Sequence, residues 1–286
     1  MRVRDVCLML SLVAVSIAAT SASAQQAANA AIPNIPDLMH KVIDHQKQVD
    51  KLRENYTFTS AQTTEYLDGN GHVTKTETQE ADDLYVNGHL IERTVKKNGK
   101  PLAGHDEDKE TARVTKLVEK AEKTPPGQPL EGQTFSVSRM LDIMDVRNPR
   151  RETYQGRPTI VFDFIGRKDA ETHGLAEDMS KKLQGTLWVD ETGLQVVHLD
   201  VSFNDKFHVG GGLLATIDKG TSVRFDQAPV EDGLWLPTGS EVTVLGRLLM
   251  VKSMRQHITE KDYDFKVFRV ETQQNKDAKV TEPKKP

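Results

Sequence analysis

The stretch GTLWVDETGLQVVHLDVSF, residues 185 to 203, holds two runs of alternating side chains on either side of a short turn. Successive side chains of a β-strand point to opposite faces, so this alternation indicates strands with one buried face and one wet face. The apolar face of the second run holds Val197, Leu199, Val201 and Phe203, and its polar face holds His198, Asp200 and Ser202. A turn at 191–193 would place Leu187 opposite Val197. The stretch therefore predicts an antiparallel hairpin that buries one side.

Other parts of the chain repeat this pattern. The turn signal DGNG at 68–71 and the Asn-Gly pairs at 87–88 and 98–99 separate β-rich runs, and Asn-Gly favours a two-residue hairpin because both positions adopt positive φ. In RPTIVFDFIGR, residues 157–167, the side chains on one face are Ile160, Phe162 and Phe164. The run EVTVLGRLLMVKSM at 241–254 predicts a further strand. Because helices do not alternate with strands, we expect about ten strands in one large antiparallel sheet rather than a parallel one.

Three segments have the apolar spacing of helices. They are residues 36–55, residues 105–123 and residues 135–145, the last with Met140, Leu141 and Met144 on one side. The predicted fold class is mainly β with α, in which a large curved antiparallel sheet is covered on one face by about three helices. Either the helices fill the concave side of the sheet, or a hydrophobic cavity remains between sheet and helices.

The beginning of the chain has the features of a secretory signal peptide. Arg2 and Arg4 precede an apolar run, and Ala-Ser-Ala ending at Ala24 predicts cleavage before Gln25. We expect a periplasmic or secreted protein that does not span the membrane. The predicted organisation is a signal peptide at 1–24, a flexible leader at 25–33, a single domain at 34–270 and a disordered tail at 271–286.

Composition argues against several classes of function. Cys7 is the only cysteine and falls in the predicted signal peptide, so the exported chain would have no disulfide, cysteine nucleophile or cysteine metal ligand. The formal net charge is -4, and a mildly acidic, mixed surface argues against a nucleic-acid partner. His40 and His45 lie five residues apart on a predicted helix and off a shared face, and no H-E-x-x-H occurs. We expect no metal and no cofactor.

Residues with catalytic potential do not form a known motif. Ser240 lacks the G-x-S-x-G elbow of a hydrolase, and neither His198 nor Asp190 can be assigned to it from the sequence. The glycines of GGGLLATIDKGTS, residues 210–222, do not form a phosphate-binding loop, because the lysine precedes the last glycine instead of following it. They predict a sharp bend after which Leu213 and Leu214 turn inward.

Several motifs taken together point to a known family. They are the signal peptide, the N-terminal helix that runs into ENYTF at 54–58, the stretch at 185–203, GLWLP at 233–237 and DYDFKVF at 262–268. In these features the chain resembles, over about residues 34–270, the LolA-like superfamily of periplasmic lipoprotein carriers and related lipid-binding or sensor domains. The resemblance implies a half-open β-barrel wrapped around helices, acyl chains held in its hydrophobic interior, and no catalytic residues.

Two functional hypotheses follow. In the first, the exported protein is not an enzyme and holds a lipid, or the acyl chain of a lipoprotein partner, in a hydrophobic cavity between sheet and helices. The candidate cavity residues are Phe58, Met140, Leu141, Met144, Ile160, Phe162, Phe164, Leu187, Val197, Leu199, Val201, Phe203, Leu213 and Leu214. In the second, the protein is an envelope interaction or sensor module whose curved sheet binds a partner protein. The polar run TKTETQEADD at 74–83 favours the second, because it suits a lipid-facing wall poorly.

Overall fold

The computed structural model describes residues 31–125, 128, 130, 142–231 and 234–267. The predicted signal peptide, most of the predicted leader and the tail at 271–286 lie outside the described residues. The described helices are α2 (Ile35–Arg53), α3 (His105–Lys123) and α5 (Leu175–Ser180). The strands are β1 (Tyr56–Leu67), β2 (Val73–Val86), β3 (His89–Lys97), β4 (Lys100–Pro101), β5 (Met144–Tyr154), β6 (Arg157–Gly166), β7 (Leu183–Asp190), β8 (Val196–Phe203), β9 (Phe207–Val209), β10 (Ala215–Ile217), β11 (Ser222–Glu231), β12 (Leu234–Leu248) and β13 (Lys252–Val267).

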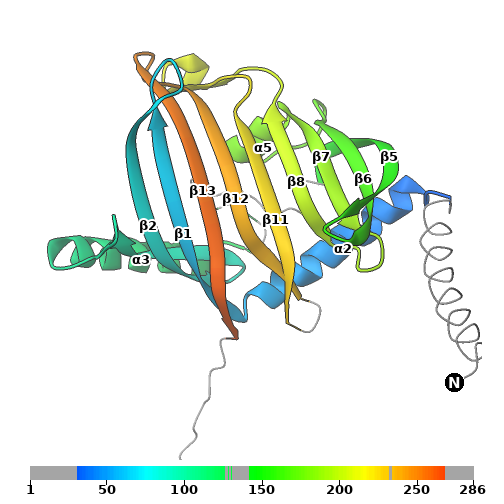
Figure 1. Ribbon diagram of the computed structural model, residues 1–286, viewed down its shortest axis with the longest axis horizontal. Coiled ribbons are helices and arrows are strands. Elements are labelled where there is room, and N and C mark those ends of the chain that lie inside the picture. Colours follow the sequence, from blue (N-terminus) through cyan, green and yellow to red (C-terminus); the bar gives the residue numbers. More distant parts are fainter. Residues whose placement is uncertain (1–30, 126–127, 129, 131–141, 232–233, 268–286) are drawn as a thin grey trace, which may run out of the picture.

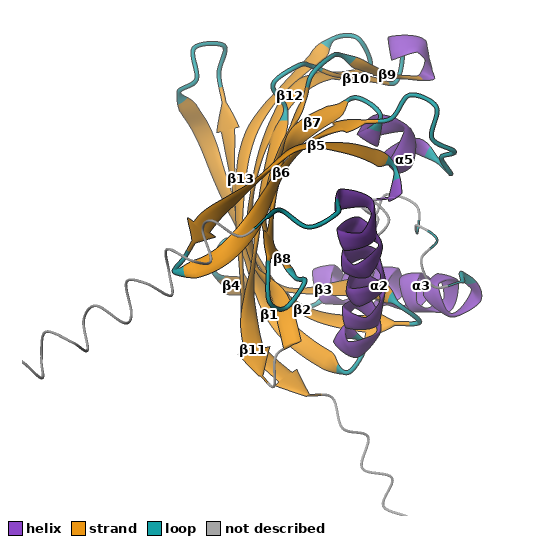
Figure 2. Cartoon of the chain, turned by 90° about the vertical axis from the view of Figure 1, so that its right-hand side faces the viewer, coloured by secondary structure: helices purple, strands orange, loops and turns teal. Residues whose placement is uncertain are grey.

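One antiparallel sheet contains all the described strands. Its order is β4-β3-β2-β1-β13-β12-β11-β8-β7-β6-β5, and Figure 1 labels the strands from β2 to β5 of this order. The short strand β10 pairs with one end of β12, and β9 pairs with β10. The sheet is not closed, because β4 and β5 are the two ends of this order. Seen from the side, it curves, and α2 lies across its concave side (Figure 2). The predicted fold class, a large curved antiparallel sheet with helices, is confirmed.

The helix α2 forms for reasons visible in its first turn. The side chain of Asn34 accepts a hydrogen bond from the backbone N–H of Asp37 at 3.1 Å, and Pro36 occupies the first turn, where its missing N–H is no loss. The apolar side of α2 packs on the sheet and forms what we name the α2 cluster. Its members are Leu38, Met39, Val42, Met144, Ile160, Phe162, Phe164, Leu187, Val189, Val196, Leu199 and Val201.

The helix α3 covers a different part of the sheet. It packs on β2 and β3, where Ala121 and Ile91 are buried together and Leu84 and Leu117 flank them. The side chain of Asn87, in the turn between β2 and β3, donates to the backbone oxygen of Ala121 at 3.2 Å. The hairpin at this end of the sheet is therefore fixed to a helix.

The hairpin signals in the sequence are confirmed, but two turns differ from the prediction. The turn between β7 and β8 is longer than 191–193, because the backbone N–H of Asp190 bonds the oxygen of Gln195, and Leu187 lies opposite Leu199 instead of Val197. This shift by two residues keeps Leu187 on the buried face. The run at 241–254 is not one strand, since a turn at Leu249 and Met250 divides it.

The predicted helix at 135–145 is corrected at its end. Most of that segment lies outside the described residues, and Met144 is the first residue of β5. The short helix α5 lies in a segment that the sequence marks only as polar, and it was not predicted. No described helix combines the length and the apolar character needed to cross a membrane.

Candidate functional site

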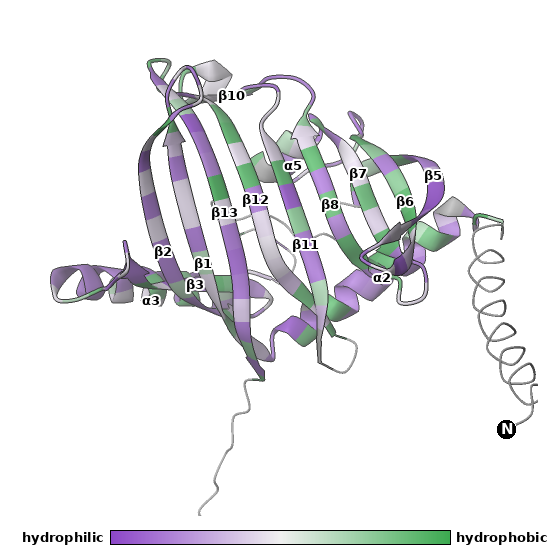
Figure 3. Cartoon of the chain, in the orientation of Figure 1, coloured by the Kyte–Doolittle hydropathy of each residue, from purple (hydrophilic) through white to green (hydrophobic). Residues whose placement is uncertain are grey.

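The apolar face beneath α2 brings together half of the fourteen predicted cavity residues. Colouring by hydropathy shows apolar bands on β6 and β8, whereas β2 is mostly polar (Figure 3). Seven of the candidates belong to the α2 cluster: Met144, Ile160, Phe162, Phe164, Leu187, Leu199 and Val201. Val197 and Phe203 are also buried, outside this cluster. The side chains of Leu38, Met39 and Val42 pack against this face from α2.

The remaining candidates lie elsewhere. Phe58 is buried on β1, where its ring contacts the rings of Tyr85 and Phe265. Met140 and Leu141 lie outside the described residues. The single candidate surface drawn from the sequence is therefore split between at least two places in the fold.

The prediction that Leu213 and Leu214 turn inward is wrong. Instead of turning inward, both are exposed, at 64% and 57%. The three glycines at 210–212 all have positive φ, so the chain bends sharply as predicted. The bend lies between β9 and β10, which pair only with each other and with one end of β12. The two leucines are therefore not part of the α2 cluster.

Polar side chains interrupt the contact between α2 and the sheet. Gln46 is fully buried on α2, and its Nε2 donates to Oε1 of buried Gln195 at 3.1 Å. Nε2 of Gln195 also contacts Nε2 of His45, and burial lowers the pKa of that histidine. Two turns further along α2, the guanidinium of Arg53 donates to Gln227 at 2.9 Å. The amide oxygen of Gln46 and the amide nitrogen of Gln227 have no hydrogen-bond partner.

The two unpartnered amide atoms weaken the contact between α2 and the sheet. A buried polar group without a partner loses its hydration and costs roughly 1–3 kcal/mol. An amphipathic stripe made only of apolar side chains would not bear that cost. The sequence predicts the apolar stripe of α2 but not the burial of Gln46, because one polar residue beside a stripe does not reveal whether it is covered. The contact between α2 and the sheet is thus less favourable than its apolar area suggests.

A second polar feature, which we name the acid cluster, consists of Asp83, Glu260 and Asp262. Ser60 of β1 lies opposite Asp262 of β13, and Phe58 lies opposite Asp83 of β2, so one strand separates the two aspartates. Burial raises the pKa of Asp83 to about 7, and burial together with the charges of Glu260 and Asp83 raises the pKa of Asp262 to about 8. One carboxyl oxygen of each aspartate has no hydrogen-bond partner. Nothing in the spacing of these residues along the sequence indicates that they meet.

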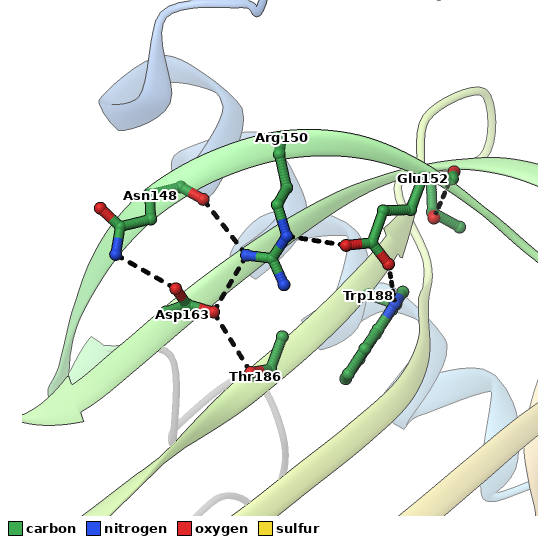
Figure 4. A network of polar contacts seen from close by, with 7 residues as sticks. Asn148, Arg150, Glu152, Asp163, Thr186 and Trp188 are labelled. Carbon is green, nitrogen blue, oxygen red and sulfur yellow. Dashed lines mark hydrogen bonds and ion pairs between the residues drawn. The ribbon is translucent and has the colours of Figure 1, made fainter.

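A polar network fixes the other face of the sheet near β5 (Figure 4). Arg150 bonds Glu152 at 2.7 Å and Asp163 at 3.0 Å, and Trp188 donates to Glu152 at 3.3 Å. Burial raises the pKa of Asp163, but hydrogen bonds from Asn148 and Arg150 outweigh it, and the pKa lies below its usual range. The charged groups of this network are paired with one another. We therefore infer that this network stabilises the edge strand β5.

The residues weighed as hydrolase candidates do not converge. His198 bonds Asp226 at 2.8 Å and stacks on Tyr154 with ring centroids 4.9 Å apart. Ser240 lies opposite Phe225, the residue next to Asp226 on β11, so the serine and the histidine–aspartate pair face opposite sides of the sheet. Asp190 is buried and bonds Arg157 at 2.6 Å and the backbone of Gly193. Within the described residues, no cluster of metal-ligating side chains is present.

A pocket of about 420 Å³ opens at the end of the sheet where β10 meets β12. Its lining is polar and basic, and it consists of Asp218, Lys219, Leu245, Gly246, Arg247, Ser253, Met254 and Arg255. None of these residues belongs to the predicted cavity, and the α2 cluster is not part of the lining.

Comparisons with known proteins found matches among solved structures. No family model matches the sequence, and no curated protein matches it. A LolA superfamily protein from Nitrosomonas europaea is similar at a TM-score of 0.37 and 13% identity, over 80% of this chain and 92% of that one. An outer membrane lipoprotein-sorting protein domain from Vibrio parahaemolyticus has a TM-score of 0.37 and 11% identity, over 80% and 93%. A DUF1329 family protein from Desulfovibrio piger has a TM-score of 0.37 and 11% identity, over 80% and 92%. The first of these descriptions names the LolA superfamily, and the second names lipoprotein sorting.

Proposed function

We propose that the protein is an exported, non-enzymatic binding protein that takes up a lipid or the acyl chain of a lipoprotein between α2 and the sheet. The observation that supports this most is the α2 cluster: a wide apolar sheet face closed by one helix. That helix is held partly through buried glutamines with unpartnered atoms. Movement of α2 would expose the apolar face to a ligand.

The energetics favour an acyl chain as the ligand. Uptake requires that α2 give up the contacts of Leu38, Met39 and Val42 with the sheet. A bound acyl chain would restore this burial at about 0.8 kcal/mol per methylene. Since movement of α2 also returns the unpartnered amide oxygen of Gln46 to water, the exchange needs fewer methylenes than it would if that oxygen had a partner. No charged group has to enter the apolar region.

The predicted signal peptide supports export, and the polar outer strands support a restricted binding region. Residues 73–76 of β2 are exposed, so that part of the sheet offers no apolar wall. The ligand would therefore lie over β6, β7 and β8, and not over the whole concave side.

The experiment compares uptake of a dansyl-labelled fatty acid by the natural chain and by a variant whose helix is more firmly seated. In Gln46→Leu with Gln195→Leu, two buried amides are replaced by apolar side chains of similar size, so α2 should bind the sheet more tightly and fatty-acid uptake should fall. The control is Lys47→Leu, which places the same side chain on the exposed side of α2.

The result distinguishes between the two functional hypotheses that the sequence suggests. Uptake by the natural chain and by Lys47→Leu, with at least about tenfold weaker uptake by the double variant, supports the proposal. Failure of the natural chain to take up the probe, with capture of a single envelope protein instead, would favour the interaction-module alternative. Equal uptake by all three proteins would place the ligand away from α2.

A further inference from the structure

Two neighbouring loops at one end of the sheet expose large apolar side chains. We name this surface the apolar tip, and it consists of Leu213, Leu214, Leu249, Met250 and Val251, whose exposed fractions range from 57% to 86%. The loops are joined by a hydrogen bond from the backbone N–H of Leu249 to the oxygen of Leu214 at 2.9 Å. Figure 1 shows this end of β12 and β13 at the top of the view. Isolated exposed leucines are common, but five large apolar residues gathered at an extremity are not.

The loop that contains Leu249 and Met250 has a backbone conformation that these residue types disfavour. Leu249 and Met250 have φ of 48° and 64°, in the left-handed region that bulky side chains adopt at a cost in free energy. Two other hairpins of this chain use Asn-Gly at such positions, with Asn87 and Asn98 at φ of 51° and 50°. Backbone strain of this kind gathers at functional positions, and here it presents two apolar side chains to solvent.

Basic side chains lie close to the apolar tip on β12, β13 and the turn before β11. Lys219, Arg247, Lys252 and Arg255 are exposed, and no ion pair joins any of them to an acidic side chain among the described residues. Three of them line the 420 Å³ pocket, together with the single acid Asp218, which lies 3.5 Å from Lys206. The chain as a whole is acidic, so this gathering of cations is a local feature.

We propose that the apolar tip docks the protein on an anionic lipid bilayer. Leucine and methionine side chains enter the boundary between headgroups and acyl chains, and the surrounding basic residues contact the phosphates, one of which the pocket can accommodate. A protein partner fits less well, because a tip formed by two projecting loops offers little area, whereas a membrane surface accepts any convex apolar point. This inference goes beyond the proposed function, since docking requires neither movement of α2 nor an acyl chain inside the protein.

The test is flotation with vesicles of phosphatidylethanolamine and phosphatidylglycerol, and with vesicles of phosphatidylcholine alone. All proteins are prepared without the predicted signal peptide at 1–24, because its apolar run would itself bind lipid. The natural chain should bind the anionic vesicles and bind phosphatidylcholine about tenfold more weakly, with the difference reduced at high salt.

The informative variant replaces Leu249 by Asn and Met250 by Gly. It removes two apolar anchors and installs the residues that this turn conformation favours, so it should fold at least as stably while its binding to anionic vesicles falls about 100-fold. Leu52→Asn is the control, because Leu52 is equally large and half exposed but lies at the end of α2, near the opposite end of β1 and β13. A second variant, Arg247→Gln with Lys219→Gln, should lose the preference for anionic vesicles.

The results that would overturn the proposal are distinct from a failure of the proposed function. Absence of binding to anionic vesicles by the natural chain, or undiminished binding by Leu249→Asn with Met250→Gly, would refute docking through the tip. Equal binding to both kinds of vesicle would refute the role of the basic residues. Fatty-acid uptake measured on the same proteins should be unchanged by the tip variants, so either proposal can fail alone.

Discussion

Asp262→Asn should remove part of a dependence of stability on pH that the acid cluster imposes. In the folded protein the pKa of Asp83 is about 7 and that of Asp262 about 8, both raised first of all by burial. The pKa of Glu260 is also raised, again by burial. In the unfolded chain these carboxyls ionise near their ordinary pKa of about 4. Between these values the unfolded state has lost protons that the folded state retains.

The sign of the effect follows from this difference in bound protons. Stability falls with rising pH wherever the folded state binds more protons than the unfolded state. The contribution of the acid cluster is therefore fully present below about pH 4 and is lost as the pH rises through about 8. Groups with lowered pKa have the opposite dependence, but the most strongly lowered of the described carboxyls, Glu110 at about 2, acts below this window.

The pKa values of the two aspartates also bound the size of the change in unfolding free energy. Each pKa unit corresponds to about 1.4 kcal/mol, so shifts of this size give an upper bound of several kcal/mol for each aspartate. Asp262 is partly exposed, and solvent screens its charge, which reduces the contribution of that residue to about 1–2 kcal/mol. We therefore expect the natural chain to lose about 2–4 kcal/mol of unfolding free energy between pH 5 and pH 9 through this cluster.

Urea unfolding at intervals of one pH unit from pH 5 to pH 9 measures this loss of unfolding free energy. Asp262→Asn should flatten the dependence and should be more stable than the natural chain at pH 9 by about 1–2 kcal/mol. Asp82→Asn is the control and should change the dependence much less, because Asp82 is exposed, points to the opposite face from Asp83, and is the smallest of the causes that raise the pKa of Asp83. Curves for the natural chain and Asp262→Asn that run parallel from pH 5 to pH 9 would refute the reasoning.

Three further predictions concern stability, and thermal or urea unfolding checks each. Phe162→Ala removes a fully buried ring from the α2 cluster and should cost about 3–5 kcal/mol, against less than about 0.5 for exposed Leu90→Ala. Gly185→Ala should destabilise by about 2 kcal/mol or more, since a Cβ there would overlap the backbone of the neighbouring strand β8, whereas Gly69→Ala meets nothing within 4 Å. Arg157→Gln leaves the buried carboxylate of Asp190 without its ion pair and should cost about 1–3 kcal/mol.

The sequence predicts the structure correctly where a local signal decides it. Asn87 and Asn98 adopt the positive φ that an Asn-Gly hairpin needs, and β2 and β3 begin and end close to the predicted positions. The prediction failed at the turn of Leu249 and Met250, because neither residue signals a turn and both continue an apolar strand pattern. The register between β7 and β8 was missed because Leu194 adopts a positive φ of 54° that a leucine does not suggest.

The candidate site was only partly predictable for a different reason. The alternating strands identified the apolar face that α2 covers, since alternation is a property of each strand alone. Whether that face holds a ligand depends on how closely α2 packs, and the contact of Gln46 with Gln195 joins residues 149 positions apart. The acid cluster likewise joins β2 to β13 across β1. Contacts of this range are set by the completed sheet, and no window of sequence contains both partners.

Three of the departures from local rules among the described residues have different consequences for binding. The strained turn at Leu249 exposes apolar side chains, and the buried amide of Gln46 loosens a helix over an apolar face, so each creates a possibility of binding. The acid cluster consists of carboxyl groups on β2 and β13, so its cost changes with pH and it adds no apolar surface for a ligand. Natural sequences tend to break local rules at functional positions. On that basis, a substitution in the turn at Leu249 or in α2 should alter binding before it alters the fold. A substitution in the acid cluster should alter the fold before it alters binding.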